Sequence, residues 1–205
     1  MAFIETTAPD ETSGQARAML ERQQRSWGFV PNYAKVFSDR ADIMDLWAAL
    51  LAGIRRHIDP RRFELVTFAA ALELGNSYCA LAHGRTLQEK FLSAEEMKGL
   101  ASGDTSGFPE SERAMMALAR KVIADSASVT QADIDRLRRS GLRDEEIFDV
   151  VATAAARAFF AKLPDALGVA PDSSFMEMDE ALRASLTVGR PIASEPLEHL
   201  AEAAR

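Results

Sequence analysis

Apolar residues recur along this chain at helical spacing, and alternating apolar and polar positions are rare. Period-two runs of Val, Ile, Thr and aromatic residues are nearly absent, whereas Ala, Leu, Met, Glu and Arg dominate the periodic segments. The pattern therefore predicts an all-α protein. The expected helices cover residues 14–27, 41–57, 60–74, 78–91, 93–100, 109–127, 130–140 and 144–163.

Several of these segments carry signals of where a helix begins and which side it buries. Asp59 followed by Pro60 supplies a capping side chain and the residue favoured at the first helical position. Residues 63–74 are apolar on nearly every side, which is typical of a buried central helix. For the helix expected over residues 41–57, the predicted inner side consists of Ile43, Leu46, Trp47, Leu50, Leu51 and Ile54.

The chain has 205 residues, enough for one well-buried domain and few for two. The clearest linker is the stretch ASGDTSGF at residues 101–108, which separates two groups of expected helices. Beyond residue 172 prolines and charges are mixed, so we expect this tail to pack on a neighbour or stay mobile.

Charge and hydropathy limit the classes of function. Acidic residues outnumber Lys and Arg by 31 to 24, and no basic cluster stands out, which disfavours nucleic-acid binding. The first residues resemble no secretory signal, and no apolar stretch is long enough to span a membrane. We therefore expect a cytoplasmic protein without membrane or nucleic-acid partners.

Cys79 is the one cysteine of the chain. A disulfide within the chain is therefore impossible, and zinc sites that need two cysteines from one chain are excluded. This cysteine content fits a reducing compartment.

Cys79 and His83 lie four residues apart, so both side chains fall on one face of one helix. Asn76 and Ser77 are natural caps, which would place Cys79 in the first turn, where the helix dipole favours a thiolate. Glu64 is a carboxylate on the preceding, buried-looking helix and needs a partner there.

Two interpretations of these residues remain open from the pattern alone. In one, Glu64, Cys79 and His83 form a reactive thiol flanked by a proton-transfer pair. In the other, the cysteine is a small buried apolar residue, and the glutamate closes a salt bridge to Arg157 or Arg85. A metal site made of the same three residues is disfavoured, because mixed three-ligand sites normally contain more His or Cys.

The ordered set Glu64, Asn76, Cys79, His83 resembles the motif of the alkylhydroperoxidase D (AhpD)-like, carboxymuconolactone decarboxylase superfamily. That motif has a glutamate, a Cys-x-x-Cys pair and a histidine at these intervals. The text NSYCALAH at residues 76–83 is similar to the peroxidase-related branch. Further similarity lies in residues 28–32, 128–130, 141–147 and 166–169.

The resemblance implies an AhpD-like helical bundle that forms a homo-oligomer, commonly a dimer, trimer or hexamer. It covers about residues 25–172, with an N-terminal helical extension over 1–24 and a C-terminal tail over 173–205. It implies that Cys79 attacks a hydroperoxide while Glu64 and His83 relay protons. No cofactor and no metal are implied.

The departure from the motif is Asn76, which occupies the place of the first cysteine, the one that resolves the sulfenic acid. Three functions follow from the resemblance. The favoured one is a single-cysteine peroxidase that needs an external thiol reductant. The others are a decarboxylase-like acid–base enzyme acting on a lactone, with Arg85 or Arg157 holding its carboxylate, and an inactive protein with a binding or structural role.

Overall fold

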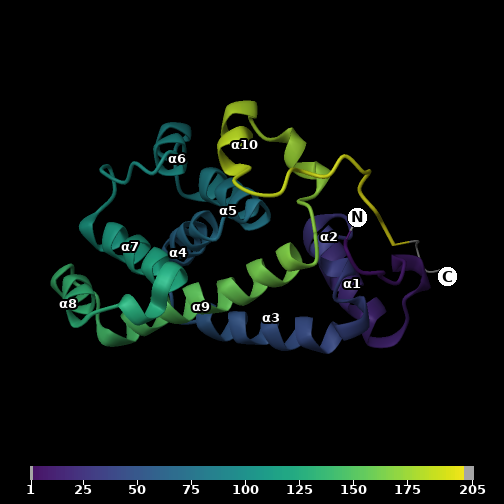
Figure 1. The fold of residues 1–205 in the computed structure, drawn as a ribbon, viewed down its shortest axis with the longest axis horizontal. Coiled ribbons are helices and arrows are strands. Elements are labelled where there is room, and N and C mark those ends of the chain that lie inside the picture. The colour runs from purple at the N-terminus through teal and green to yellow at the C-terminus, as the bar shows by residue number, and fades with distance from the viewer. Residues whose placement is uncertain (1, 201–205) are drawn as a thin grey trace.

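The computed structural model describes residues 2–200, and within them the chain is helical, with no β-strand beyond one isolated bridge (Figure 1). The all-α prediction is confirmed. The helices are α1 (Gly14–Trp27), α2 (Asn32–Lys35), α3 (Ala41–Arg55), α4 (Pro60–Glu73), α5 (Ser77–Lys90), α6 (Ala94–Ala101), α7 (Glu110–Asp125), α8 (Gln131–Arg139), α9 (Asp144–Ala166) and α10 (Glu180–Leu186).

Helix α4 forms the centre of the bundle and packs against α5, α7 and α9. Its residues from Phe63 to Ala71 are all buried, as the apolar pattern predicts. Leu65, Val66 and Phe68 are completely inaccessible to solvent, and burying side chains of this size stabilises a fold by roughly 1.5–3 kcal/mol each. The central helix therefore links the packing of three others.

Helix starts follow the capping signals in the sequence. The carboxylate of Asp59 accepts a hydrogen bond from the backbone N–H of Arg62 (3.1 Å) at the start of α4. Ser93 and Glu96 form a capping box at the start of α6, with bonds of 2.7 and 3.2 Å. Local chemistry thus determines these helix ends.

The predicted inner side of α3 is wrong in part. Met44, Leu51 and Ile54 are buried, whereas Leu46 is 67% exposed and Leu50 is 56% exposed. The helix is apolar on several sides, and α9 covers one of them, so periodicity alone did not separate the buried side from the open one. The residues that face outward against the prediction are Ile43, Leu46 and Leu50.

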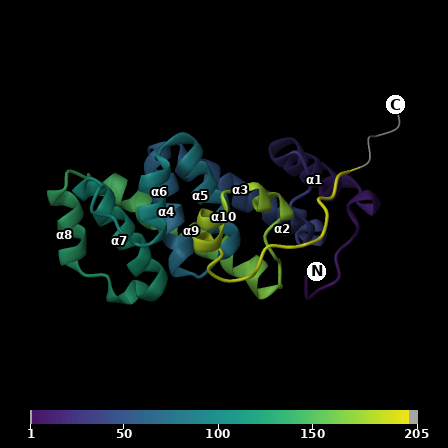
Figure 2. The ribbon, with the colours of Figure 1, turned by 90° about the horizontal axis from the view of Figure 1, so that it is seen from above.

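The chain beyond residue 172 packs on its own bundle up to residue 200. Helix α10 lies against α5 and α6, and the Leu186 side chain is fully buried where Gly84 leaves room for it. The segment after α10 runs back toward the N-terminal region, where Val30 N–H donates to Glu198 O (2.8 Å; Figure 2). The predicted division into residues 1–24, 25–172 and 173–205 stays a prediction, and residues 201–205 lie outside the described part.

No helix within residues 2–200 combines the length and the apolar character that crossing a membrane requires.

Candidate functional site

Glu64 of α4 and His83 of α5 form a buried hydrogen-bonded pair. The Oε2 atom of Glu64 lies 2.5 Å from Nδ1 of His83, and the two side chains are 7% and 15% exposed. Burial raises the pKa of Glu64, but the hydrogen bond with His83 and the charges of His83, Arg157 and Arg55 together leave that pKa below its usual range. Burial lowers the pKa of His83. We therefore assign a carboxylate that accepts Nδ1–H from a neutral imidazole, which leaves Nε2 as a free base.

Cys79 lies in the first turn of α5, one turn before His83, as predicted. Its side chain is buried, and its sulfur makes no hydrogen bond within residues 2–200. Burial raises the pKa of the thiol to about 11, although the charge of Arg157 opposes this. The expectation of a lowered thiol pKa is wrong for this structure, because desolvation outweighs the helix dipole.

Asn76 caps α5 and ties it to α9. Its Oδ1 atom accepts the backbone N–H of Cys79 (2.7 Å), and its Nδ2 donates to the Ala161 carbonyl (3.2 Å) and to Asp165 Oδ2 (2.7 Å). The side chain is 1% exposed, so all these bonds are shielded from water. At the position where the resemblance expects a cysteine, the chain thus has an amide that orders the start of α5.

Arg157 extends from the middle of α9 toward the same region. The residue is 6% exposed, and its guanidinium carbon lies 5.5 Å from the centre of the Trp47 ring and 5.2 Å from that of Phe63. The Arg157 side chain makes no hydrogen bond or ion pair within the described residues, and its buried Nε has no partner. Its positive charge nevertheless acts on Cys79 and Glu64.

The alternative in which Glu64 closes a salt bridge to an arginine is not what the structure shows. The carboxylate binds His83 instead, and Arg157 remains without an ion-pair partner in residues 2–200. Arg85 lies over the rings of Trp27 and Phe175, at 5.8 and 4.9 Å. Of the two arginines considered from the sequence, only Arg157 therefore acts on Glu64 and the thiol.

An aromatic wall beside the site was not found by sequence reasoning. Tyr33 of α2 packs edge-on against Tyr78 and Phe160, with ring centres 5.5 and 5.1 Å apart, and Phe160 stacks on Trp47 at 4.1 Å. The Tyr78 hydroxyl binds the carboxylate of Asp172. Helical spacing marks these residues as apolar core, and nothing in the local sequence separates them from other core positions.

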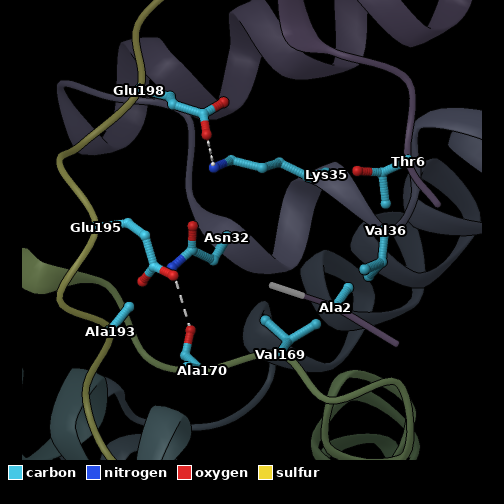
Figure 3. Close-up of a pocket in the computed structure, with 10 residues that line it drawn as sticks. All are labelled: Ala2, Thr6, Asn32, Lys35, Val36, Val169, Ala170, Ala193, Glu195 and Glu198. Atoms are coloured by element: carbon cyan, nitrogen blue, oxygen red, sulfur yellow. Dashed lines mark hydrogen bonds and ion pairs between the residues drawn. The ribbon is translucent and has the colours of Figure 1, made fainter. Parts of the chain in front are cut away.

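Two pockets lie away from Cys79. One is between α2 and the C-terminal segment, where Lys35 binds Glu198 with Nζ 2.6 Å from Oε1 (Figure 3). The other is lined in part by His57, Arg62 and Asp149. Neither is lined by the predicted site residues. Within residues 2–200 there is also no group of three or more His, Cys, Asp or Glu side chains arranged to hold a metal ion.

Comparisons with known proteins relate part of the sequence to a family and the whole fold to solved structures. Residues 41–106 match the model of the carboxymuconolactone decarboxylase family, a range that includes Glu64, Asn76, Cys79 and His83. The chain is similar to the crystal structure of an AhpD-core, peroxidase-related protein from Ralstonia eutropha JMP134, with 24% identity, a TM-score of 0.73, and coverage of 86% of this chain and 95% of the other. A peroxidase-related protein from Silicibacter sp. TM1040 gives 18% identity, a TM-score of 0.76 and the same coverages. The chain therefore contains a segment similar to the carboxymuconolactone decarboxylase family, and its fold is AhpD-like.

Another structure that resembles this chain is that of an enzyme with a different described activity. A cysteine-to-alanine variant of the debrominase Bmp8, in complex with 2,3,4-tribromopyrrole, is 19% identical with a TM-score of 0.65 and covers 84% of this chain and 89% of its own. No curated protein matches the chain. At these identities the structural likeness establishes the AhpD-like fold.

Proposed function

We propose that the chain is a single-cysteine thiol peroxidase of the alkyl hydroperoxide reductase type. The observation that carries this proposal is the 2.5 Å hydrogen bond between Glu64 and His83, one helical turn from Cys79. A carboxylate bound to Nδ1 fixes the imidazole ring and raises the basicity of Nε2. The pair therefore has the composition of a proton relay, and its histidine lies on the same helix as the thiol.

The proposed reaction uses these three side chains in order. His83 Nε2 accepts the proton of Cys79, and the thiolate attacks the terminal oxygen of the hydroperoxide. The S–O bond forms as the O–O bond breaks, and the imidazolium returns the proton to the departing alkoxide. The products are an alcohol and a sulfenic acid on Cys79.

The buried thiol makes the relay necessary. With a pKa of about 11, only about one thiol in ten thousand is ionised at pH 7. A base that accepts the proton during the attack removes the need for a preformed thiolate. A buried, protonated Cys79 can therefore still react, provided that the Glu64–His83 pair removes its proton.

Regeneration requires a thiol from outside the chain, because Cys79 has no cysteine partner in the sequence. An external thiolate would attack the sulfenic sulfur, form a mixed disulfide and release water. A second external thiol would then free Cys79 and leave as a disulfide with the first. The proposed partners are thus a small hydroperoxide and a thiol reductant.

One observation favours a second candidate, the decarboxylase-like acid–base enzyme. Arg157 is a buried cation beside Glu64 and His83, which suits a substrate that carries a carboxylate. In that reaction the Glu64–His83 pair would move protons on a lactone, and the thiol would not be needed. Retention of activity in a Cys79→Ser variant would identify this alternative.

The decisive experiment is the intact mass of the protein after one equivalent of an organic hydroperoxide, with a sulfenic-acid trap present. We expect one adduct per chain, absent in Cys79→Ser, and formed faster than on a free low-molecular-weight thiol. No adduct, together with slow alkylation of Cys79, would refute the peroxidase.

A further inference from the structure

We propose that Arg157 is the binding group for a carboxylate on the molecule that Cys79 attacks, so that the preferred substrates are small organic acids, such as hydroperoxides that carry a carboxylate. This inference rests on the proposed function and adds the substrate class to it. Its starting point is a buried guanidinium with no partner in the part of the chain that the structure describes.

A guanidinium removed from water needs an anion or several acceptors. Arginine has five N–H donors in one plane and stays charged at any physiological pH. Leaving such a group buried and unpaired costs several kcal/mol, so proteins normally pair it. Arg157 is 6% exposed, and its Nε–H has no acceptor. The guanidinium of Arg157 therefore lacks an anionic partner in the part of the chain that the structure describes.

The protein's own acceptors near Arg157 are engaged elsewhere. The carboxylate of Glu64, whose charge acts on Arg157, binds His83 at 2.5 Å. The hydroxyl of Tyr33 donates to Gln23 Oε1 at 2.5 Å. A ligand carboxylate would supply the acceptor that Arg157 Nε–H lacks within residues 2–200.

The surroundings of the guanidinium suit a carboxylate with a small apolar body. The rings of Trp47 and Phe63 lie 5.5 and 5.2 Å from its centre, and Trp47 is held by stacking on Phe160. Aromatic neighbours restrict the plane of the guanidinium, and the edge of a guanidinium binds a carboxylate through two parallel N–H···O bonds. The same rings offer apolar surface to the rest of the ligand.

The test compares two alkylating reagents that differ in charge. Iodoacetate and iodoacetamide react identically: the Cys79 sulfur forms an S–C bond and iodide leaves. At fixed pH, any change in thiolate population alters both rates equally, so their ratio reports recognition of the carboxylate alone. We expect Arg157→Gln to lower the iodoacetate-to-iodoacetamide rate ratio at Cys79 by at least about tenfold, the scale of a lost charged hydrogen bond.

Matched variants make this result specific. Arg157→Lys keeps the charge and should retain a ratio closer to that of the unmodified protein. Arg85→Gln removes another arginine that lies over aromatic rings, those of Trp27 and Phe175, and should leave the ratio unchanged. An unchanged ratio in a folded Arg157→Gln variant, or an equal fall in Arg85→Gln, would overturn the inference.

A measurement on the unmodified protein covers the case in which Arg157→Gln does not fold. Benzoate should slow the reaction of Cys79 with iodoacetamide, whereas benzamide at the same concentration should not. Equal protection by both compounds would contradict the inference. Failure of the proposed function is distinct, because a protein that forms no sulfenic acid with a hydroperoxide could still alkylate with charge selectivity.

Discussion

Arg61 and Arg157 are both partly or fully buried in this helix bundle, yet their surroundings differ completely. Arg61, in the first turn of α4, donates to both oxygens of Glu112 at 2.8 and 3.1 Å and to the Phe91 carbonyl at 2.7 Å. Arg157, on α9, is the more buried of the two, and its side chain makes no hydrogen bond in residues 2–200. The more deeply buried charge is thus the less satisfied one.

This contrast separates a structural charge from one that is available to a ligand. The pair of Arg61 and Glu112 joins α4 to α7, and the bond to Phe91 adds the end of α5. Each guanidinium nitrogen of Arg61 and each carboxylate oxygen of Glu112 has a hydrogen-bond partner within the fold, so this pair is not a candidate for binding a ligand. Arg157 has the opposite property, and it lies beside Glu64 and Cys79. Unmet bonding capacity near reactive groups is the feature that indicates function.

The largest expected effect concerns the region of Arg157. Glu64→Gln and His83→Ala should each slow hydroperoxide oxidation of Cys79 by about 10²- to 10⁴-fold, the usual loss when general acid–base help is removed. Stopped-flow measurement of sulfenic-acid formation would check this. His57→Ala, in the separate pocket next to Arg62 and Asp149, is the control and should react normally. Normal rates in both relay variants would remove the relay from the mechanism.

Replacing each arginine by methionine, an apolar residue of similar length, tests which of the two charges stabilises the fold. Arg61→Met should lower the free energy of unfolding by about 2–3 kcal/mol, because it leaves the Glu112 carboxylate and the Phe91 carbonyl without their donor. Arg157→Met should cost less than about 1 kcal/mol or stabilise, since no partner is lost. Urea unfolding of both variants would decide. A larger loss for Arg157→Met would mean that its charge is structural.

The cap of α5 gives a smaller effect. Asn76→Ala should destabilise the protein by about 1–2 kcal/mol, because it removes the bond to the Cys79 N–H and the bonds to α9. Asn76→Cys tests the correspondence with the family motif. If the positions match, oxidised protein should contain a disulfide to Cys79, detectable as a loss of two mass units, and its absence would contradict the match.

The smallest effect is on stability at acid pH. The lowered pKa of His83 means that the unfolded chain binds a proton below pH 6.5 while the folded protein does not, so stability falls as the pH drops below 6.5. The lowered pKa of Glu64 has the same sign but acts only below pH 4.5. Chemical unfolding at pH 7 and pH 5 should therefore show a loss that is reduced in His83→Gln. An equal loss in both proteins would show that other groups cause it.

The helices were predictable because their signals are local. The start of α4 at Pro60 and of α9 at Asp144 agree with the predicted bounds, since capping and periodicity act within a few residues. The end of α9 differs, because the helix continues through Pro164 to Ala166, although proline lacks the N–H that would bond back to the preceding turn.

For the site, residue identity specifies which groups are present and their order along the chain. The spacing from Glu64 to His83 predicts a carboxylate, a thiol and an imidazole on adjacent helices, and Asn76 excludes a second thiol. Such information is carried by residue identity and by the geometry of single helices.

The pairing of these groups depends on how the helices pack in three dimensions. It placed Glu64 on His83 rather than on an arginine, raised the pKa of Cys79 by burial, and left Arg157 unpaired between Trp47 and Phe63. Hydrogen-bond partners and desolvation depend on atoms that are distant in sequence and that meet only when α3, α4, α5 and α9 pack together.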